Sequence, residues 1–398
     1  MATITGQGTT YGLPNYHGEL FTVTPTETPF LSAIGGLQGA KKTTATQFEW
    51  QTVDRRTSTS NNVALEGANA PTAAERSRSN VTNVVEIHQS AIELSYTRLA
   101  ASGNFAGANI APEMDDATID ELTLQTTAEL QSMAVDIEQS FLNGVYQKPA
   151  NNSTARQTRG LLTAISTNAV VGPVSVGTAT VVAATGVWTT SAAHGCVVGD
   201  AVELGPITTT TGVSARTRYY VITQGAANTF VLSATKGGSG LTLTGDGSTS
   251  AVYKSATVTK ANIDNLLSTA FANGAKLTTD TTVLMVGPGQ KVGLSNTYST
   301  ATLNQPTFTR NIGGVAMDTL ITDFGVYPIM LNRWMPAGYI GLVDLSVCYP
   351  VFLEIPGKGL LFAEELGRVG AARKFQLYGE IGLEYGPETF HGVLTGLL

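Results

Sequence analysis

The segment whose spacing comes nearest to a phosphate-binding loop is GPGQKVG, from Gly287 to Gly293. Its pattern is GxGxxxG, whereas a dinucleotide-binding loop reads GxGxxG and is followed by an acidic residue about 20 positions later. It also lacks the Lys-Ser or Lys-Thr pair of a P-loop. We therefore interpret it as a turn between a strand and a helix, and we expect neither a nucleotide nor any other cofactor.

His194 and Cys196 lie two positions apart in AHGCVVGD, a spacing that suggests metal ligands. A structural zinc site needs four such ligands, and no second pair accompanies this one. We interpret the segment as a β-turn in which Gly195 and Gly199 adopt backbone angles that favour glycine. The sequence contains no GxSxG, HExxH or EF-hand motif, although it leaves open a Ser/His/Asp triad assembled in space. We predict neither a metal site nor an enzyme.

Charged side chains gather near the C-terminus: Glu364, Glu365, Glu380, Glu384 and Glu388 with Arg368, Arg373 and Lys374. One interpretation is a pair of carboxylates for acid–base catalysis. The interpretation we favour is that these charges meet across contacts between subunits, where charge sets the register more than the affinity.

Charge is scarce overall, because only 13% of the 398 residues are charged, about half the usual share. The net charge is −7 and no run of Lys or Arg occurs, so we expect no basic groove that follows phosphates. A mildly acidic protein can still enclose DNA without adhering to it. We expect no signal peptide and no membrane span. Two isolated cysteines, Cys196 and Cys348, fit a reducing cytoplasm.

The elements that would position these residues follow a distinct order. Residues 1–40 are rich in Gly and Pro and predict an extended arm that becomes ordered by lying on something else. Alternating polar and apolar residues predict strands over 43–56 and 81–97, joined by a long polar tip. Two strands cannot bury both faces by themselves, so we expect this ribbon to pack on a neighbouring molecule.

One long amphipathic helix is predicted from Pro112 to Gly144, with acids in its first turn and apolar residues at steps of three and four. Its length is roughly 48 Å, so it needs a sheet or another subunit beside it. Residues 168–258 then turn to Val, Thr, Ala and Gly with frequent turns, which predicts a small all-β domain. Helices are expected at 262–275 and 291–298, and strands at 281–286, 320–333, 338–355 and 375–397.

With these parts placed, the chain resembles a tailed-bacteriophage major capsid protein with the Hong Kong 97-like fold. The segments TVTPTETPFLSAIG (22–35), FEWQTVDRR, LEGANAP and the tail GEIGLEYGPETFHGVLTGL are similar to one capsid subfamily. The resemblance implies an α+β fold with an N-terminal arm, an extended β-ribbon called the E-loop, a peripheral (P) domain with a long spine helix, and an axial (A) domain. It divides the chain into the arm 1–40, the E-loop 41–100, the P domain 101–154, the A domain 155–167 and 259–350, an inserted all-β domain 168–258 on the capsid exterior, and a return to the P domain over 351–398.

The function implied by the resemblance is self-assembly into hexamers and pentamers that form an icosahedral shell around double-stranded DNA. The implied partners are other copies of the chain, a portal protein, and scaffold or cement proteins, with assembly in the host bacterial cytoplasm and no membrane. We expect the inter-subunit contacts to involve Phe30, Phe48, Trp50, Arg55, Arg56, Glu364, Arg368 and Arg373. Two alternatives remain open from sequence: a receptor-binding β protein of the phage tail, and an encapsulin-like compartment shell.

Overall fold

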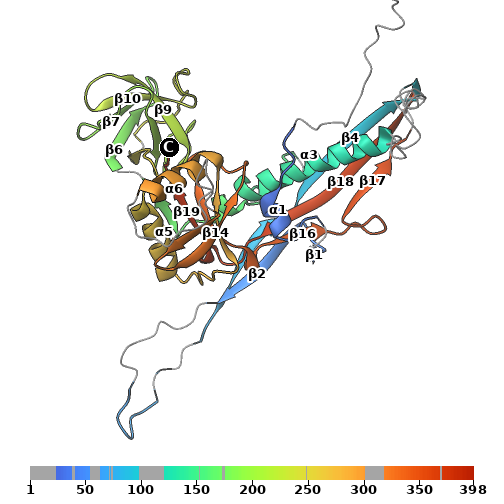
Figure 1. The fold of residues 1–398 in the computed structure, drawn as a ribbon, viewed down its shortest axis with the longest axis horizontal. Helices are drawn as coiled ribbons and strands as arrows, with labels where there is room; N and C mark the ends of the chain where they lie inside the picture. The colour runs from blue at the N-terminus through green and yellow to red at the C-terminus, as the bar shows by residue number, and fades with distance from the viewer. Residues whose placement is uncertain are drawn as a thin grey trace, which may run out of the picture.

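The computed structural model describes residues 24–37, 41–53, 63–70, 72, 75–97, 121–151, 153–172, 175–247, 249–300, 318–367 and 370–398. They form an α+β structure with three parts: an elongated sheet with a long helix along it, a six-stranded sheet covered by helices, and a closed β-barrel (Figure 1).

The elongated sheet is built around its longest strand, β18 (Ala372–Glu384). One edge of β18 pairs antiparallel with β4 (Glu86–Ser95), in a register from Ala372 opposite Ser95 to Ile381 opposite Glu86. The other edge pairs with β17 (Leu361–Glu365) and β16 (Tyr349–Leu353), and β16 continues into a parallel pair with β1 (Lys41–Thr43). The sheet therefore joins segments from both ends of the chain.

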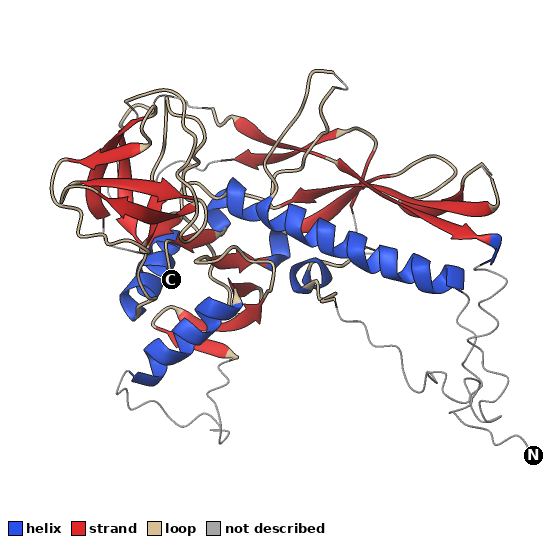
Figure 2. Cartoon of the chain, turned by 90° about the horizontal axis from the view of Figure 1, so that it is seen from above, coloured by secondary structure: helices blue, strands red, loops and turns tan. Residues whose placement is uncertain are grey.

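Helix α3 (Glu121–Asn143) lies along this sheet, as Figure 2 shows. Met133, Ile137 and Phe141 fall on one side of the helix at spacings of four, and all three are buried against apolar side chains of β16 and β18. The helix ends at the predicted position, whereas the predicted start at Pro112 lies outside the described residues. Gly144 is needed here because a Cβ would lie 2.5 Å from the carbonyl oxygens of both Ser140 and Thr158.

A two-stranded ribbon projects from the elongated sheet (Figure 1). It pairs β2 (Gln47–Val53) antiparallel with β3 (Arg78–Val84), from Gln47 opposite Val84 to Val53 opposite Arg78. The two predicted strands are confirmed in type, although the second one is divided at Val85 into β3 and β4. The division lets β3 pair within the ribbon while β4 pairs with β18.

The six-stranded sheet has the strand order β13 (Thr319–Thr322), β14 (Gly325–Leu331), β12 (Thr282–Val286), β15 (Ile340–Asp344), β19 (Gly392–Thr395) and β5 (Ala169–Val171). Alternate residues of β12 face opposite sides. Leu284 and Val286 join the core under α5 (Lys260–Ala272) and α6 (Pro288–Thr300). Val283 and Met285 join the core that contains α3 and α4 (Leu161–Ala164). This sheet is therefore covered on both faces.

The sheet pairing differs from the predicted division at two places. Residues 169–171 were expected in the inserted all-β segment, and 392–395 among the strands of the returning tail. They instead pair with each other, Ala169 opposite Val393, at the edge of the six-stranded sheet. The reason is that strand partners more than 200 residues apart leave no trace in local composition.

The barrel closes in the order β10–β7–β6–β11–β8–β9. Its strands are β6 (Ser175–Val182), β7 (Val187–Thr190), β8 (Ala201–Leu204), β9 (Arg218–Gln224), β10 (Thr229–Ser233) and β11 (Thr249–Lys254). Side chains including Trp188, Val221, Phe230 and Val252 fill its interior. The all-β character predicted for this region is confirmed. The described part of the chain also contains the short helices α1 (Pro29–Ala33), η2 (Leu345–Val347) and η3 (Glu388–Phe390).

Candidate contact surfaces

Phe30, predicted as a contact of the arm, lies inside the core of its own subunit. Its side chain is 0% exposed, and it packs in the same cluster as Ile137 and Phe141. The buried carboxylate of Glu138 on α3 accepts hydrogen bonds from the backbone N–H groups of Phe30 (3.0 Å) and Leu31 (2.6 Å). This short helix is anchored to α3 and the Phe30 ring is covered within its own subunit, so its contact with a neighbouring subunit stays a prediction.

Phe48 and Trp50, at the base of the ribbon, also make their described contacts within the chain. The Trp50 indole N–H donates to the Gly386 carbonyl at 2.9 Å, and its ring meets Tyr385 edge-on at 4.9 Å. Phe48 is 9% exposed and lies against Gly382, where a Cβ would come 2.7 Å from the phenyl ring. These two side chains hold the ribbon to the body, a role that alternation of polar and apolar residues could not reveal.

The charged candidates have mixed outcomes. Arg55, Arg56 and Arg368 lie outside the described residues. Arg373 pairs with both carboxylate oxygens of Glu365, at 3.1 Å each, and Glu364 pairs with Lys358; all four side chains are substantially exposed. Such exposed pairs contribute at most about 1 kcal/mol to folding.

The other acids of the tail serve the fold of the subunit. Glu380 pairs with Arg156 at 2.8 Å, and Glu384 with Lys41 at 2.8 Å. Burial tends to raise the pKa of Glu388, but hydrogen bonds from the Thr167 hydroxyl and from the backbone N–H groups of Ser166 and Thr167 outweigh it and lower that pKa. These three carboxylates hold together segments that are far apart in the sequence.

The tip of the ribbon carries an exposed apolar feature that the sequence analysis did not single out. Ala68 N–H donates to the Leu65 carbonyl at 3.0 Å, and Gly67 has a φ of 80°, which closes a turn that needs glycine at its third position. Val63 and Leu65 are 81% and 86% exposed. Two apolar side chains within the polar stretch SNNVALEGANAP were the available signal.

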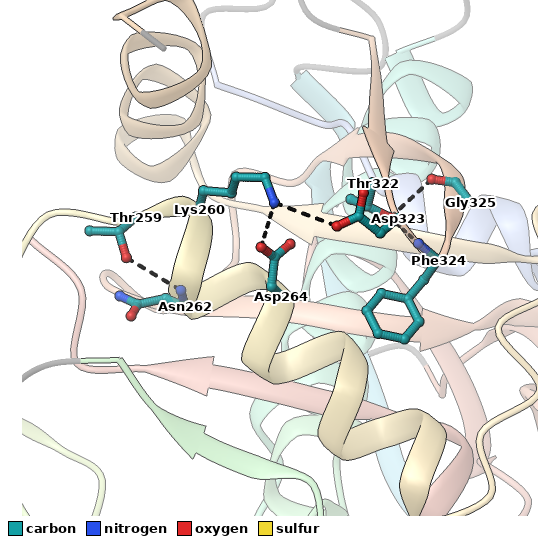
Figure 3. A network of polar contacts seen from close by, with 8 residues as sticks. All are labelled: Thr259, Lys260, Asn262, Asp264, Thr322, Asp323, Phe324 and Gly325. Atoms are coloured by element: carbon teal, nitrogen blue, oxygen red, sulfur yellow. Dashed lines mark hydrogen bonds and ion pairs between the residues drawn. The ribbon is translucent and has the colours of Figure 1, made fainter. Parts of the chain in front are cut away.

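A second exposed apolar feature is the ring pair Phe271 and Phe324, whose centroids lie 6.1 Å apart. Phe271 lies in the last turn of α5 and is 62% exposed, and Phe324 is in the β13–β14 turn and is 36% exposed. Figure 3 shows how the turn is held: Lys260 Nζ lies 2.6 Å from Asp264 and 3.8 Å from Asp323. Lys260 and Asp264 both belong to α5, so the exposed Lys260–Asp323 pair is the contact drawn here that bridges α5 and the turn beside the two rings.

Thr322 and Thr259 stabilise the same region (Figure 3). The Thr322 hydroxyl donates to the Gly325 carbonyl at 3.0 Å and accepts from the Phe324 N–H at 3.3 Å. The Thr259 hydroxyl caps α5 by accepting from the Asn262 N–H at 3.3 Å.

The two motifs considered for chemistry have structural roles. Gly287 joins β12 to α6, so the predicted strand-to-helix connection is present, but the other six residues of GPGQKVG form the start of α6, which begins at Pro288 rather than at the predicted Lys291. The His194 ring accepts a hydrogen bond from the Cys196 N–H at 3.0 Å, and Gly195 and Gly199 have φ of 62° and 93°. Within the described residues no group of three or more His, Cys, Asp or Glu side chains is arranged to hold a metal ion. Nor does the described part of the chain contain a helix that is long and apolar enough to span a membrane.

Comparison with known proteins agrees with this architecture. The family described as SU10 major capsid protein matches residues 3–398. No curated protein sequence matches the chain. Among solved structures, the capsid asymmetric unit of cyanophage A-1(L) is similar with a TM-score of 0.54 and 13% identity, covering 98% of each chain. The capsid of the native GTA particle is similar with a TM-score of 0.52 and 12% identity, covering 100% of this chain and 99% of that one. At these identities the likeness concerns the fold.

Proposed function

Because the chain belongs to the SU10 major capsid protein family and is therefore a shell-forming phage capsid subunit rather than an enzyme, we propose that it assembles as hexamers and pentamers around double-stranded DNA. The observation that carries this proposal is the ribbon. Its paired strands extend away from the body (Figure 1). In the described turn between them along the chain, Val63 and Leu65 are 81% and 86% exposed. Apolar side chains at the tip of a projecting ribbon gain free energy only when another molecule covers them.

We assign the parts of the subunit to the Hong Kong 97-like plan. The arm is 1–40, the E-loop 41–100, and the P domain 101–154 together with 351–391, with α3 as the spine helix. The A domain comprises the six-stranded sheet and its helices, so the strands at 169–171 and 392–395 are assigned to it because they pair with each other at its edge. The support for this division is the sheet pairing and the two separate cores on either side of β12.

The barrel is assigned to the capsid exterior, where extra mass clashes with nothing inside the shell. This surface is the place where we expect cement proteins, whereas a portal protein would occupy one vertex and a scaffold protein would guide assembly in the host bacterial cytoplasm. The low charge and net acidity of the chain support a shell that encloses DNA without binding its sequence.

The contact residues we now propose differ from those chosen by sequence. Val63 and Leu65 on the ribbon tip and the pair Phe271 and Phe324 replace the buried Phe30 and the intramolecular Phe48 and Trp50. Exposed apolar and aromatic side chains gain free energy when a neighbouring subunit covers them. Arg373 and Glu364 stay as proposed charged contacts at the far end of the elongated sheet.

The test is a double variant, Val63→Ser with Leu65→Ser, compared with Val182→Ser on the barrel. Val182 is 49% exposed and serves as a matched surface control. We expect the double variant to fold, because neither side chain is buried, but to form few or no shells by electron microscopy and size-exclusion chromatography. The control should assemble normally. Shells from the double variant at the wild-type yield would contradict the proposed role of the tip.

A further inference from the structure

The last three residues of the chain lie between the barrel and the six-stranded sheet. On the barrel side, Ala256 N–H donates to the Gly396 carbonyl at 3.2 Å and Leu398 N–H donates to the Ala256 carbonyl at 3.0 Å. On the other side, Leu397 N–H donates to the Gly338 carbonyl at 3.2 Å, and the Gln290 amide donates to the Leu398 carbonyl at 3.0 Å. The C-terminus therefore bonds to both parts at once.

Two neighbouring barrel strands add side chains to this junction. Glu203 on β8 and Arg218 on β9 are paired in register. Glu203 Oε1 accepts from the Gly396 N–H at 2.8 Å, and the Arg218 guanidinium donates to the Leu397 carbonyl. Beside them, Arg216 donates to the Ile165 carbonyl at 2.8 Å, and the Tyr339 hydroxyl donates to the Arg216 carbonyl.

The centre of this junction is buried: Glu203 and Leu397 are 1% and 0% exposed, whereas Leu398 at its edge is 58% exposed. Burial raises the pKa of Glu203 to about 7, although the Thr395 hydroxyl, the Gly396 N–H and the charges of Arg218 and Arg216 oppose this. A buried carboxyl of this kind is weak evidence for stability, but it can specify one arrangement of the groups around it.

The barrel has a core of its own. Its apolar cluster, which includes Trp188 and Phe230, shares none of the described buried residues of the two clusters in the rest of the subunit. Its strands also close on themselves. Its internal folding and its orientation on the subunit are therefore held by different sets of contacts.

We propose that Gly396–Leu398 act as a latch that fixes the orientation of the barrel on the subunit, with Glu203 and Arg218 as the positioning residues. This inference concerns the unassembled subunit and does not depend on how the shell is built. The latch predicts that the barrel can lose its fixed orientation while it stays folded.

Gly338 offers a specific way to open the latch. It has a φ of 85°, and a Cβ there would lie 2.1 Å from Arg218 Nη2 and 2.5 Å from the Leu397 carbonyl oxygen. Gly338→Ala therefore inserts a methyl group between the latch and its partner. Gly357→Ala is the matched control, because Gly357 has a φ of 79° but nothing within 4 Å of its Cβ position. Both variants carry the same kind of backbone strain, and only the first meets the latch.

The measurement is the distance between spin labels at Lys236→Cys on the barrel and Ser268→Cys on α5, both exposed positions, in full-length unassembled subunits. The two native cysteines are buried. Hydrogen exchange is followed in parallel at the Gly396 and Leu398 amides and in the β6–β11 ladder. Arg218→Met, which removes the guanidinium but keeps the apolar stem, is a second variant.

We expect Gly338→Ala and Arg218→Met to broaden the distance distribution and to speed exchange at Gly396 and Leu398 at least tenfold. The β6–β11 amides should stay protected, and Gly357→Ala should match the parent. An unchanged distribution in both latch variants would overturn the proposal. Loss of protection in the β6–β11 ladder together with the junction would also overturn it, because the latch and the barrel fold would then be one unit.

Discussion

Replacing Glu203 with Gln removes a buried charge at the junction while keeping an oxygen that can accept from the Gly396 N–H. Burial raises the pKa of Glu203 from 4.5 to about 7. At about 1.4 kcal/mol for each tenfold change in proton affinity, this difference corresponds to a free energy on the order of 3 kcal/mol. The carboxyl group is almost completely buried, so solvent screening reduces this figure little.

The sign follows from proton binding. Between about pH 4.5 and 7 the closed junction holds a proton that the open, hydrated carboxyl has lost. The free energy of opening therefore falls as the pH rises through this window, and it levels off above about pH 7.

The assay is hydrogen exchange at the Gly396 and Leu398 amides between pH 5 and 8.5, corrected for the intrinsic exchange rate. Relative to its value at pH 5, the wild-type opening free energy should fall by up to about 3 kcal/mol at pH 8, whereas that of Glu203→Gln should stay nearly flat. A constant difference in opening free energy between the two proteins does not test the prediction, because the Gln side chain introduces an amide group of its own at this site. Parallel pH profiles would refute the assignment of a titrating carboxyl to this junction.

Two further predictions concern buried groups. Glu138→Ala should lower the free energy of unfolding of the α1–α3 region by about 3–5 kcal/mol, because it leaves the Phe30 and Leu31 N–H groups and the Asn332 amide without their shared carboxylate. Hydrogen exchange at Phe30 and Leu31 measures this, and a loss below about 1 kcal/mol would contradict the stated geometry. Burial raises the pKa of the Cys348 thiol, so the native protein should react with a water-soluble disulfide reagent at Cys348 only after unfolding. Equal rates of reaction before and after denaturation would contradict its burial.

The sequence was informative where the signal is local. Apolar steps of four at Met133, Ile137 and Phe141 predicted a helix along a sheet, and the end of that helix at Gly144 was predicted correctly. Alternation predicted strands on both sides of the ribbon, and frequent turns predicted an all-β region. Each of these patterns depends only on the period of a single element, so no information about distant partners was needed.

The contact residues were harder to predict from the sequence, because the environment of each side chain depends on segments that are distant in the chain. The residues around Phe30 have the composition of an exposed arm. Nevertheless Glu138, more than 100 positions away, accepts a hydrogen bond from the Phe30 N–H and holds this backbone in the core. Trp50 fits the alternating pattern of the ribbon strand, but its indole N–H donates to the carbonyl of Gly386, near the other end of the chain. Val63 and Leu65 lie in a polar segment, and only the structure shows that their side chains are 81% and 86% exposed.

By itself, the sequence determined the kinds of elements, their order and, through its motifs, the resemblance to a capsid subunit, because period, punctuation by Gly and Pro, and composition are properties of contiguous residues. Only the tertiary structure decided which strands share a sheet and which acidic side chains form pairs within the subunit. It also decided that residues 396–398 form hydrogen bonds with both the barrel and the six-stranded sheet. These features arise from pairing between segments up to several hundred residues apart. Their hydrogen bonds and buried charges are specified only when the whole chain has folded.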